Sequence, residues 1–389
     1  MNEKLWNFKF CSVIFINSLI SFSFYMITTI LMVYLTGIGV NLSKAGLIVG
    51  LFSITSLFIR PFTGYITDQF NRKKLLIIGN FFVAISIMAY VITDNLMVII
   101  LFRVIHGIAF GINSTAIVAM ASEYIPSKRF NEGIGYLGLG QVIASAVGPG
   151  LGVALMVQYG IKYAFYVSAL FSLFTMLYLL LFHYSKMIKE SKSHKILLQD
   201  IISLNVLDYA FIAGVYSFMN GGIAAFLVIY AQGKSIEDVS IYFTVSAVFL
   251  FLARPLSGKI VDKMGLKYIV YPGIIMTIIS LIFLASADSL AMILVSAVIR
   301  ALAQGAVQPL LQAASIKKVG IEKSGLATST FYLGGDIGQG AGPMIGGVIA
   351  KWYGYEEVFY LCVLLMILAL VVFYFSNRKE GKKQHNCLS

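Results

Sequence analysis

The sequence predicts an all-α polytopic membrane protein with twelve transmembrane helices in two pseudo-symmetric six-helix bundles. Three observations lead to this prediction: the composition, a series of long apolar segments, and a sequence motif that recurs in the second half of the chain. Apolar residues make up 59% of the 389 residues and charged residues only 12%, which is about half the charged share of soluble domains. A soluble chain of this composition would leave much apolar surface in contact with water.

The apolar segments define the predicted spans. Each is near the ~20 residues that a helix needs to cross about 30 Å of hydrocarbon. The first is too long for a signal-peptide core and no small-residue cleavage site follows it, so we expect an uncleaved span. Short loops with Asn, Gly, Asp, Lys and Arg separate the spans, which are 8–33, 45–66, 74–92, 96–120, 133–157, 161–184, 206–231, 239–261, 267–286, 289–313, 325–350 and 355–376.

The recurring motif indicates an internal duplication. Residues 60–74 are RPFTGYITDQFNRKK and residues 254–268 are RPLSGKIVDKMGLKY, so Arg-Pro, Gly and Asp recur 194 positions apart. Other landmarks keep the chain order at nearly the same spacing: Pro149 with Pro343, Tyr159 with Tyr353, and Arg103 with Arg300. Four matched landmarks predict two copies of one six-span unit, an organisation typical of secondary transporters.

The predicted domains follow from this duplication. They are an N-terminal six-helix bundle at 1–184, a basic cytosolic linker at 185–205, a C-terminal six-helix bundle at 206–376 and a cytosolic tail at 377–389.

The distribution of positive charge predicts the orientation. With the N-terminus inside, the inside segments carry 21 Lys and Arg residues, the outside loops carry 4, and four Arg residues lie within spans. This strong bias predicts a multi-pass protein of the cell membrane with both termini in the cytosol. It also explains the pI near 9.4 without a nucleic-acid partner.

Several other classes of function are disfavoured. The three cysteines, Cys11, Cys362 and Cys387, do not suggest a disulfide framework. GIGYLG at 133–138 fits a GxGxxG pattern but opens a membrane helix, so it does not predict a nucleotide site. Four scattered histidines predict no metal site, and no nucleophile lies in a catalytic pattern. We therefore expect neither an enzyme nor a cofactor, and a monomer whose partners are a small-molecule substrate, protons and lipid.

The motifs resemble those of the major facilitator superfamily over essentially the whole chain. Two loops match its motif between the second and third spans and the second-half copy. A span-4 motif, the loop after it, and the span-5 motif that goes with antiporting exporters also match. Asn71 and Gln69 depart from the usual Gly and basic residue, although Asn tolerates left-handed backbone. The matching residues are Gly64, Asp68, Arg72, Lys73, Gly258, Asp262, Gly265, Lys267, Arg103, Gly107, Glu123, Pro126, Arg129, Gly148, Pro149 and Gly152.

Residues at the ends of the second and eighth spans are candidates for a gate. Asp68 can cap a neighbouring helix N-terminus, or pair with Arg129 on the next loop. We expect such contacts to hold the cytosolic face closed and to break when it opens. The alternative is an ordinary polar turn, and we expect solvent around Glu123 and Asp208 near the span ends. The predicted gate residues are Gly64, Asp68, Arg72, Glu123, Arg129 and Asp262.

Ionisable residues inside the spans are candidates for proton coupling or substrate contact. A buried Arg in a membrane is by default a functional hypothesis, and the resemblance links the span-4 Arg103 to proton transfer. Asp336 lies near the middle of its span among glycines, which permit a close approach of a neighbouring helix. The alternatives are bundle-stabilising Arg residues and a permanent ion pair. The candidates are Arg103, His106, Arg300 and Asp336.

Polar residues elsewhere in the spans are candidates for cavity lining. Gln304, Gln308 and Gln312 share one face of the tenth span, and a polar stripe must face protein or water. Arg60 and Arg254 either extend toward the cytosol or face the cavity. The predicted lining residues are Asn17, Arg60, Asn220, Arg254, Gln304 and Gln308.

Glycine–proline pairs in the fifth and eleventh spans predict helix bends. Gly148-Pro149 and Gly342-Pro343 combine small residues with a missing backbone donor. Taken with the resemblance, these features favour proton-coupled export of a small organic molecule, such as a drug or a carboxylate-bearing metal chelator, by alternating access. The alternatives are an uptake symporter or facilitator for a sugar or organic acid, and a non-transporting membrane receptor.

Overall fold

The computed structural model describes residues 4–184 and 198–386, and within these residues the chain is helical and contains no strand. The long helices are α1 (Phe8–Gly37), α2 (Leu42–Gln69), α3 (Arg72–Ile92), α4 (Leu96–Ser122), α6 (Leu139–Tyr159), α7 (Ile161–Leu181), α9 (Leu207–Gly233), α10 (Ile241–Met264), α11 (Lys267–Ala285), α12 (Leu290–Val319), α13 (Ser324–Tyr353) and α14 (Tyr355–Asn386). The short helices are α5 (Phe130–Leu137), α8 (Leu198–Ile201) and the 3₁₀ turns Ser127–Arg129, Leu204–Val206 and Ile321–Lys323.

Eleven spans in the described residues are long and apolar enough to cross a membrane. One of them, Ser127–Tyr159, joins α5 and α6 across a single-residue interruption. The predicted span 325–350 corresponds to α13, a glycine-rich helix of 30 residues that is not one of these eleven. Most of the predicted linker lies outside the described residues.

Asparagine side chains begin the first four helices. Asn7, Asn41, Asn71 and Asn95 each accept a hydrogen bond from a backbone N–H in the first helical turn, which satisfies a donor that has no partner within the helix. Asn71 has φ −69°, so the suggestion of left-handed backbone at this position is wrong. Its role is to cap α3.

The described chain forms two compact units. Unit 1 contains residues 1–127, 136–202 and 320–329, and unit 2 contains residues 128–135, 203–319 and 330–389. Each unit therefore includes a short segment from the other half of the sequence, at the start of α5 or of α13. The predicted division at residues 185–205 stays a prediction.

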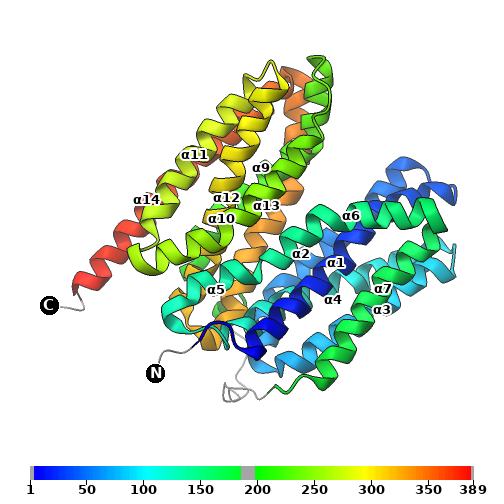
Figure 1. Ribbon diagram of the computed structural model, residues 1–389, viewed down its shortest axis with the longest axis horizontal. Helices are drawn as coiled ribbons and strands as arrows, with labels where there is room; N and C mark the ends of the chain where they lie inside the picture. The colour runs from blue at the N-terminus through cyan, green and yellow to red at the C-terminus, as the bar shows by residue number, and fades with distance from the viewer. Residues whose placement is uncertain (1–3, 185–197, 387–389) are drawn as a thin grey trace. The chain divides into compact units, whose positions relative to one another are not determined.

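Within unit 1, α1 packs against α6 and α7, α4 packs against α2 and α3, and α3 also packs against α7 (Figure 1). Gly148 and Gly152 of α6 lie directly against α1, where an added Cβ would stand 3.0 Å from Tyr25 Cβ and 2.9 Å from the Met26 carbonyl oxygen respectively. Pro149 lies inside α6. The interruption in this span is at Gly138 instead, and Asn17 Nδ2 donates to the Leu137 carbonyl oxygen there at 2.9 Å.

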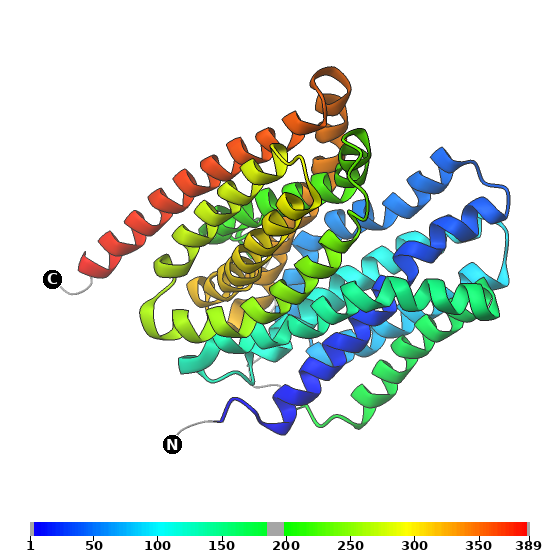
Figure 2. The ribbon, with the colours of Figure 1, turned by 45° about the horizontal axis from the view of Figure 1, so that its top comes forward.

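Within unit 2, α12 packs against α10 and α11, and α14 runs beside α9 and α11 (Figure 2). Gly334, Gly338 and Gly342 of α13 face backbone of α9 so closely that any added Cβ would collide with a carbonyl oxygen. These glycines form a seam of small residues, the usual device for close helix packing in membranes. Pro343 lies within the continuous helix α13, and bending of α6 and α13 stays a prediction.

Candidate functional site

Asp68 caps the N-terminus of α13 within unit 1. Its Oδ1 accepts from Gly325 N at 2.8 Å and its Oδ2 accepts from Leu326 N at 2.9 Å. The carboxylate thus satisfies two backbone donors that have no partner in the helix, at the end where the helix dipole favours negative charge. We call this arrangement the α13 cap. Of the two contacts expected for Asp68, it makes the helix cap.

Arg72 joins the α13 cap to a second acid. Its Nη1 lies 2.7 Å from Glu123 Oε1, and its Nη2 lies 3.4 Å from Asp68 Oδ1 and 3.1 Å from Ser324 Oγ. The side chains of Arg72 and Glu123 are each 1% exposed. The expectation that solvent surrounds Glu123 is therefore wrong, because Arg72 and Tyr184, whose hydroxyl donates to Glu123 Oε1 at 3.1 Å, enclose it. Burial and the nearby Glu123 raise the pKa of Tyr184.

Asp262 caps the N-terminus of α5 within unit 2. Its Oδ1 accepts from Asn131 N at 3.3 Å and from Asn131 Nδ2 at 2.7 Å, and its Oδ2 accepts from Glu132 N at 3.0 Å. We call this arrangement the α5 cap. Asp68 and Asp262 are 194 positions apart, and so are Asn131 and Gly325, the first residues that they cap. The two caps therefore follow the internal repeat.

Gly64 and Gly258 make room for the two caps, one turn before each aspartate. A Cβ at Gly64 would lie 3.0 Å from the Gly325 carbonyl oxygen and 2.9 Å from Leu326 Cα. A Cβ at Gly258 would lie 2.8 Å from the Asn131 carbonyl oxygen. In both copies of the repeat, the glycine thus lets the end of another helix come close, and the aspartate one turn later caps that helix end.

The charges beside the two caps differ. The cation near Asp262 is Lys317, whose Nζ lies 3.6 Å from Oδ1 and whose side chain is 45% exposed. Lys317 stands 194 positions after Glu123, and Leu266 stands 194 positions after Arg72. The sign of the charge at the Glu123 position is therefore reversed in unit 2. Arg129 pairs with Glu132 there at 2.6 Å.

Arg103 lies buried in unit 1 among aromatic rings. Its Nη2 donates to the Val49 carbonyl oxygen at 2.9 Å, and its guanidinium carbon lies 4.7 Å from the centre of the Phe52 ring. No carboxylate lies within 4.0 Å of it among the residues that the structure describes. Phe52 also packs edge-on against the fully buried His106, whose Nδ1 is 3.3 Å from the Tyr90 hydroxyl.

Arg300 is the corresponding buried cation of unit 2. Its Nη1 donates to Asn220 Oδ1 and to Gln304 Oε1, both at 2.8 Å, and its Nη2 donates to Ser246 Oγ at 3.1 Å. Gln304 Nε2 in turn donates to Gln308 Oε1 at 3.0 Å. The structure thus joins four of the predicted residues in one network. In the described residues the network supplies neutral oxygens to Arg300 and no carboxylate.

The other predicted residues lie apart from these networks. Arg60 is 3% exposed and its Nη1 donates to Ser114 Oγ at 2.6 Å, so the expectation that it extends to the cytosol is wrong. Arg254 is half-buried on α10. Asp336 is half-buried on α13, between Gly334 and Gly338 of the seam with α9. Asp208, also predicted to be solvated, pairs with Lys318 at 2.7 Å.

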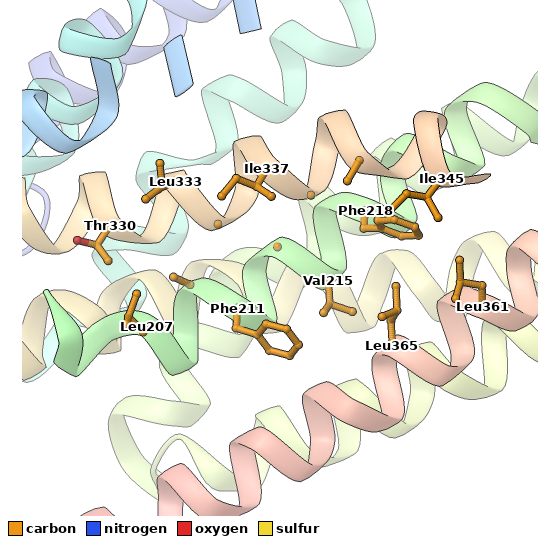
Figure 3. A pocket seen from close by; sticks show the side chains of 15 residues that line it. Leu207, Phe211, Val215, Phe218, Thr330, Leu333, Ile337, Ile345, Leu361 and Leu365 are labelled. Carbon is orange, nitrogen blue, oxygen red and sulfur yellow. The ribbon is translucent and has the colours of Figure 1, made fainter. Parts of the chain in front are cut away.

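An apolar groove runs along α9, α13 and α14 in unit 2 (Figure 3). Its volume is about 640 Å³, and the side chains labelled in Figure 3 are apolar apart from Thr330. Asp336 is not among the lining residues, although Ile337 is. The groove can accept an apolar group but offers no charge to hold an ion. The lining residues are Leu207, Ala210, Phe211, Gly214, Val215, Phe218, Thr330, Leu333, Gly334, Ile337, Gly338, Ala341, Ile345, Leu361 and Leu365.

Sequence reasoning missed the partners of the two aspartates. Gly325, Leu326 and Glu132 contribute a backbone N–H, which no side-chain pattern marks. Asn131 contributes a backbone N–H and its side-chain amide, but a single Asn does not identify its partner in the sequence. The repeat offers one usable signal. Once one partner is known, adding or subtracting 194 gives the other. Among the described residues, no cluster of His, Cys, Asp and Glu could hold a metal ion.

Comparison with known proteins identifies the family. The model of the Major Facilitator Superfamily matches residues 13–234 and 209–386. The chain belongs to the Major Facilitator Superfamily. It is therefore a multi-pass membrane transporter of small molecules and not an enzyme, as the sequence motifs predicted.

The relatives and solved structures agree with this placement. The multidrug resistance protein MdtG of Citrobacter koseri is 25% identical over 347 residues, which cover 86% of this chain and 85% of that protein. The crystal structure of the human organic anion transporter MFSD10 (TETRAN) matches with a TM-score of 0.81 at 16% identity, over 94% of this chain and 98% of that chain. The superfamily transporter FucP in its outward conformation matches with a TM-score of 0.79 at 14% identity, over 96% and 99%. At these identities the structures show the fold alone.

Proposed function

We propose that this protein is a proton-coupled exporter of small organic molecules that works by alternating access, with the α13 cap and the α5 cap as its cytosolic gate. The observation that carries the proposal is the matched pair of caps. Each holds a helix N-terminus with one aspartate, and each aspartate stands at the same position of the repeat. Hydrogen bonds of this kind form or break as a unit, which suits a two-state element.

The orientation in this proposal follows the positive charges. The bias of 21 Lys and Arg residues against 4 puts both termini and both caps on the cytosolic side of the cell membrane. The caps then close the cytosolic entrance and open when substrate enters from the cytosol.

Export is favoured over uptake by two findings. The span-5 pair Gly148-Pro149 resembles the motif of antiporting exporters, and the relative from Citrobacter koseri is named a multidrug resistance protein. Uptake of a sugar or organic acid by symport is the second candidate, and the fold likeness to FucP does not separate the two. We take the transporter to act as a monomer.

The two buried guanidinium groups favour a substrate with a carboxylate. Arg103 and Arg300 are 3% and 6% exposed and contact neutral oxygens and ring faces. A buried cation without a neutralising charge is costly, and Arg can bind a carboxylate through two parallel hydrogen bonds. The aromatic rings of Phe24, Phe52 and Phe110, whose centres lie 4.5 to 5.2 Å apart, would suit an aromatic drug as well.

Transport by the purified protein in liposomes tests the proposal. We expect a labelled carboxylate compound, such as an amino-carboxylate chelator, to accumulate when a pH gradient is imposed. Its accumulation should stop when the gradient is dissipated. We expect Arg103→Ala and Arg300→Ala to weaken its binding at least about tenfold, since a hydrogen bond to a charged group contributes roughly 1.5–3 kcal/mol. Accumulation independent of the gradient would remove proton coupling. If a quaternary ammonium dye binds tightly to the protein and to both variants, and the chelator does not bind, the substrate is a cation and the proposed preference for a carboxylate is wrong.

A further inference from the structure

A second pocket lies at the end of unit 1 where α1 begins and α4 ends. Its volume is about 550 Å³, and it is lined by Lys4, Asn7, Phe8, Lys9, Tyr124, Ile125 and Pro126. The candidate membrane spans begin at Phe8 in α1 and end at Ser122 in α4. The pocket therefore lies at the boundary between the hydrocarbon and water, whichever side of the membrane this end faces.

Hydrogen bonds hold the segment before α1 against the end of α4. Asn7 Nδ2 donates to the Tyr124 carbonyl oxygen at 3.3 Å, while Asn7 Oδ1 accepts from Phe10 N at 2.9 Å. The same side chain thus caps α1 and ties it to α4, which gives the pocket two walls of defined position.

The described residues that line the pocket carry positive charge and include no acid. Lys4 is exposed, and Lys9 Nζ lies 5.5 Å from the centre of the Tyr124 ring. In residues 4–184 and 198–386 neither lysine has a carboxylate within 4.0 Å. The adjacent acid, Glu123, is buried and already bonded to Arg72 at 2.7 Å.

Tyr124 contributes to the pocket as a neutral, buried side chain. It is 7% exposed, and its hydroxyl has no hydrogen-bond partner in the described part of the chain. Burial, together with the charge of Glu123, raises the pKa of Tyr124 to about 12, so the phenol adds no negative charge near the lysines.

Apolar surface lies beside these two lysines. Phe8 is 78% exposed and Trp6 is 51% exposed, and aromatic side chains gather at the level of lipid headgroups. The lining by Phe8, Ile125 and Pro126 suits methylene groups, while the two ammonium groups suit a phosphate. This combination matches a phospholipid and not a small free anion, which would leave the apolar walls uncovered.

We propose that this pocket binds an anionic phospholipid, with its phosphate at Lys4 and Lys9 and the start of its acyl chains against Phe8 and Pro126. The site lies beside Glu123, the partner of Arg72 in the network at the α13 cap. Lipid binding here is independent of the transport direction, the proton and the substrate, so it can be measured without them.

Native mass spectrometry of the purified full-length protein tests the site, with phosphatidylglycerol and phosphatidylcholine offered in turn. We expect one phosphatidylglycerol to be retained preferentially. We expect the double substitution Lys4→Gln with Lys9→Gln to weaken that binding about tenfold or more, because it removes both ammonium groups that attract the lipid phosphate. The matched control is Lys162→Gln with Lys351→Gln, which removes the same charge from two exposed lysines at the predicted opposite ends of the spans and should leave retention unchanged.

A second pair of variants keeps the test independent of folding. Lys4→Arg with Lys9→Arg keeps the charge and should retain phosphatidylglycerol at the original level. Equal retention by the Gln variant, equal binding of phosphatidylcholine, or displacement of the lipid by inorganic phosphate at the same concentration would each overturn the proposal.

Discussion

At the scale of single residues, Arg72 is the main difference between the two caps. It is buried with Glu123 in unit 1, at 2.7 Å, whereas the cation beside Asp262 in unit 2 is the half-exposed Lys317 at 3.6 Å. Salt screens exposed pairs far more than buried ones. The α13 cap therefore depends on a buried network and the α5 cap on a surface charge, although the two aspartates occupy equivalent positions of the repeat.

We predict that Arg72→Gln destabilises the protein by about 3–5 kcal/mol, because it removes a buried guanidinium that pairs with both Glu123 and Asp68. The matched change Lys317→Gln should cost about 0–1 kcal/mol, as expected for an exposed pair. Thermal unfolding in detergent measures both. The double change Arg72→Gln with Glu123→Gln should recover part of the lost stability, since the buried Glu123 charge is removed together with its cation. Equal losses for Arg72→Gln and Lys317→Gln would contradict the difference between the two networks.

We predict that Asp68→Asn leaves the protein folded and inserted but slows transport about tenfold. The amide has one acceptor oxygen in place of two and no charge for the helix N-terminus, a loss of roughly 1–2 kcal/mol. Uptake into liposomes measures the rate, with protein amount per vesicle as the control. Asp262→Asn should give a smaller effect, because Asn131 Nδ2 and Lys317 offer that site other contacts. Normal transport by well-inserted Asp68→Asn protein would remove the gate assignment.

At the scale of elements, the seam between α9 and α13 follows from glycine spacing. Gly334, Gly338 and Gly342 recur every four residues and so lie on one face of the helix, each opposite backbone of α9. The sequence predicted this close approach from the glycines around Asp336. It did not predict where the fifth span is interrupted, because Gly138 resembles its neighbouring glycines and only the bond from Asn17 to Leu137 marks it.

We predict that Gly338→Ala destabilises the protein by about 1–3 kcal/mol, because a Cβ there would overlap the Gly214 carbonyl oxygen and force α9 and α13 apart. Gly340→Ala is the matched control on the same helix, since a Cβ at Gly340 would meet no side chain and no neighbouring helix within 4 Å. It should be neutral or slightly stabilising. The melting temperatures of the two variants in one detergent decide the matter, and equal values would mean that the seam tolerates separation.

The same elements show why some residues were misplaced by sequence reasoning. Span boundaries and the repeat can be predicted because hydropathy and spacing are properties of the chain itself. Whether Glu123 at a span end meets water depends on Arg72, 51 positions earlier, folding over it. Arg60 was predicted either to extend toward the cytosol or to face the cavity, but it is buried and donates to Ser114 of α4 at 2.6 Å. Pairings of this kind are tertiary and leave no local pattern.

At the scale of the whole molecule, α13 connects two parts of the proposed cycle. Its first turn holds the amides that Asp68 caps, and Asp336 lies 11 positions beyond Gly325 on the same helix, which is about 16 Å along its axis. A helix is a rigid element over that length. A change in the charge of Asp336 can therefore bias how α13 packs against α9, and with it the position of the capped end. In this proposal, one helix couples the proton to the gate.

We predict that Asp336→Asn abolishes accumulation driven by a pH gradient while exchange of labelled for unlabelled substrate continues. Asn has nearly the same shape as Asp but cannot bind and release a proton, so the substrate site stays intact and the coupling is lost. Both activities are measured on the same liposomes, and accumulation should fall to the level of vesicles without a gradient. Asp288→Asn is the control, because Asp288 is 82% exposed and lies in the loop between α11 and α12. If the Asp336→Asn protein accumulates substrate normally under a pH gradient, the proton site lies elsewhere, and His106 or Arg103 becomes the next residue to test.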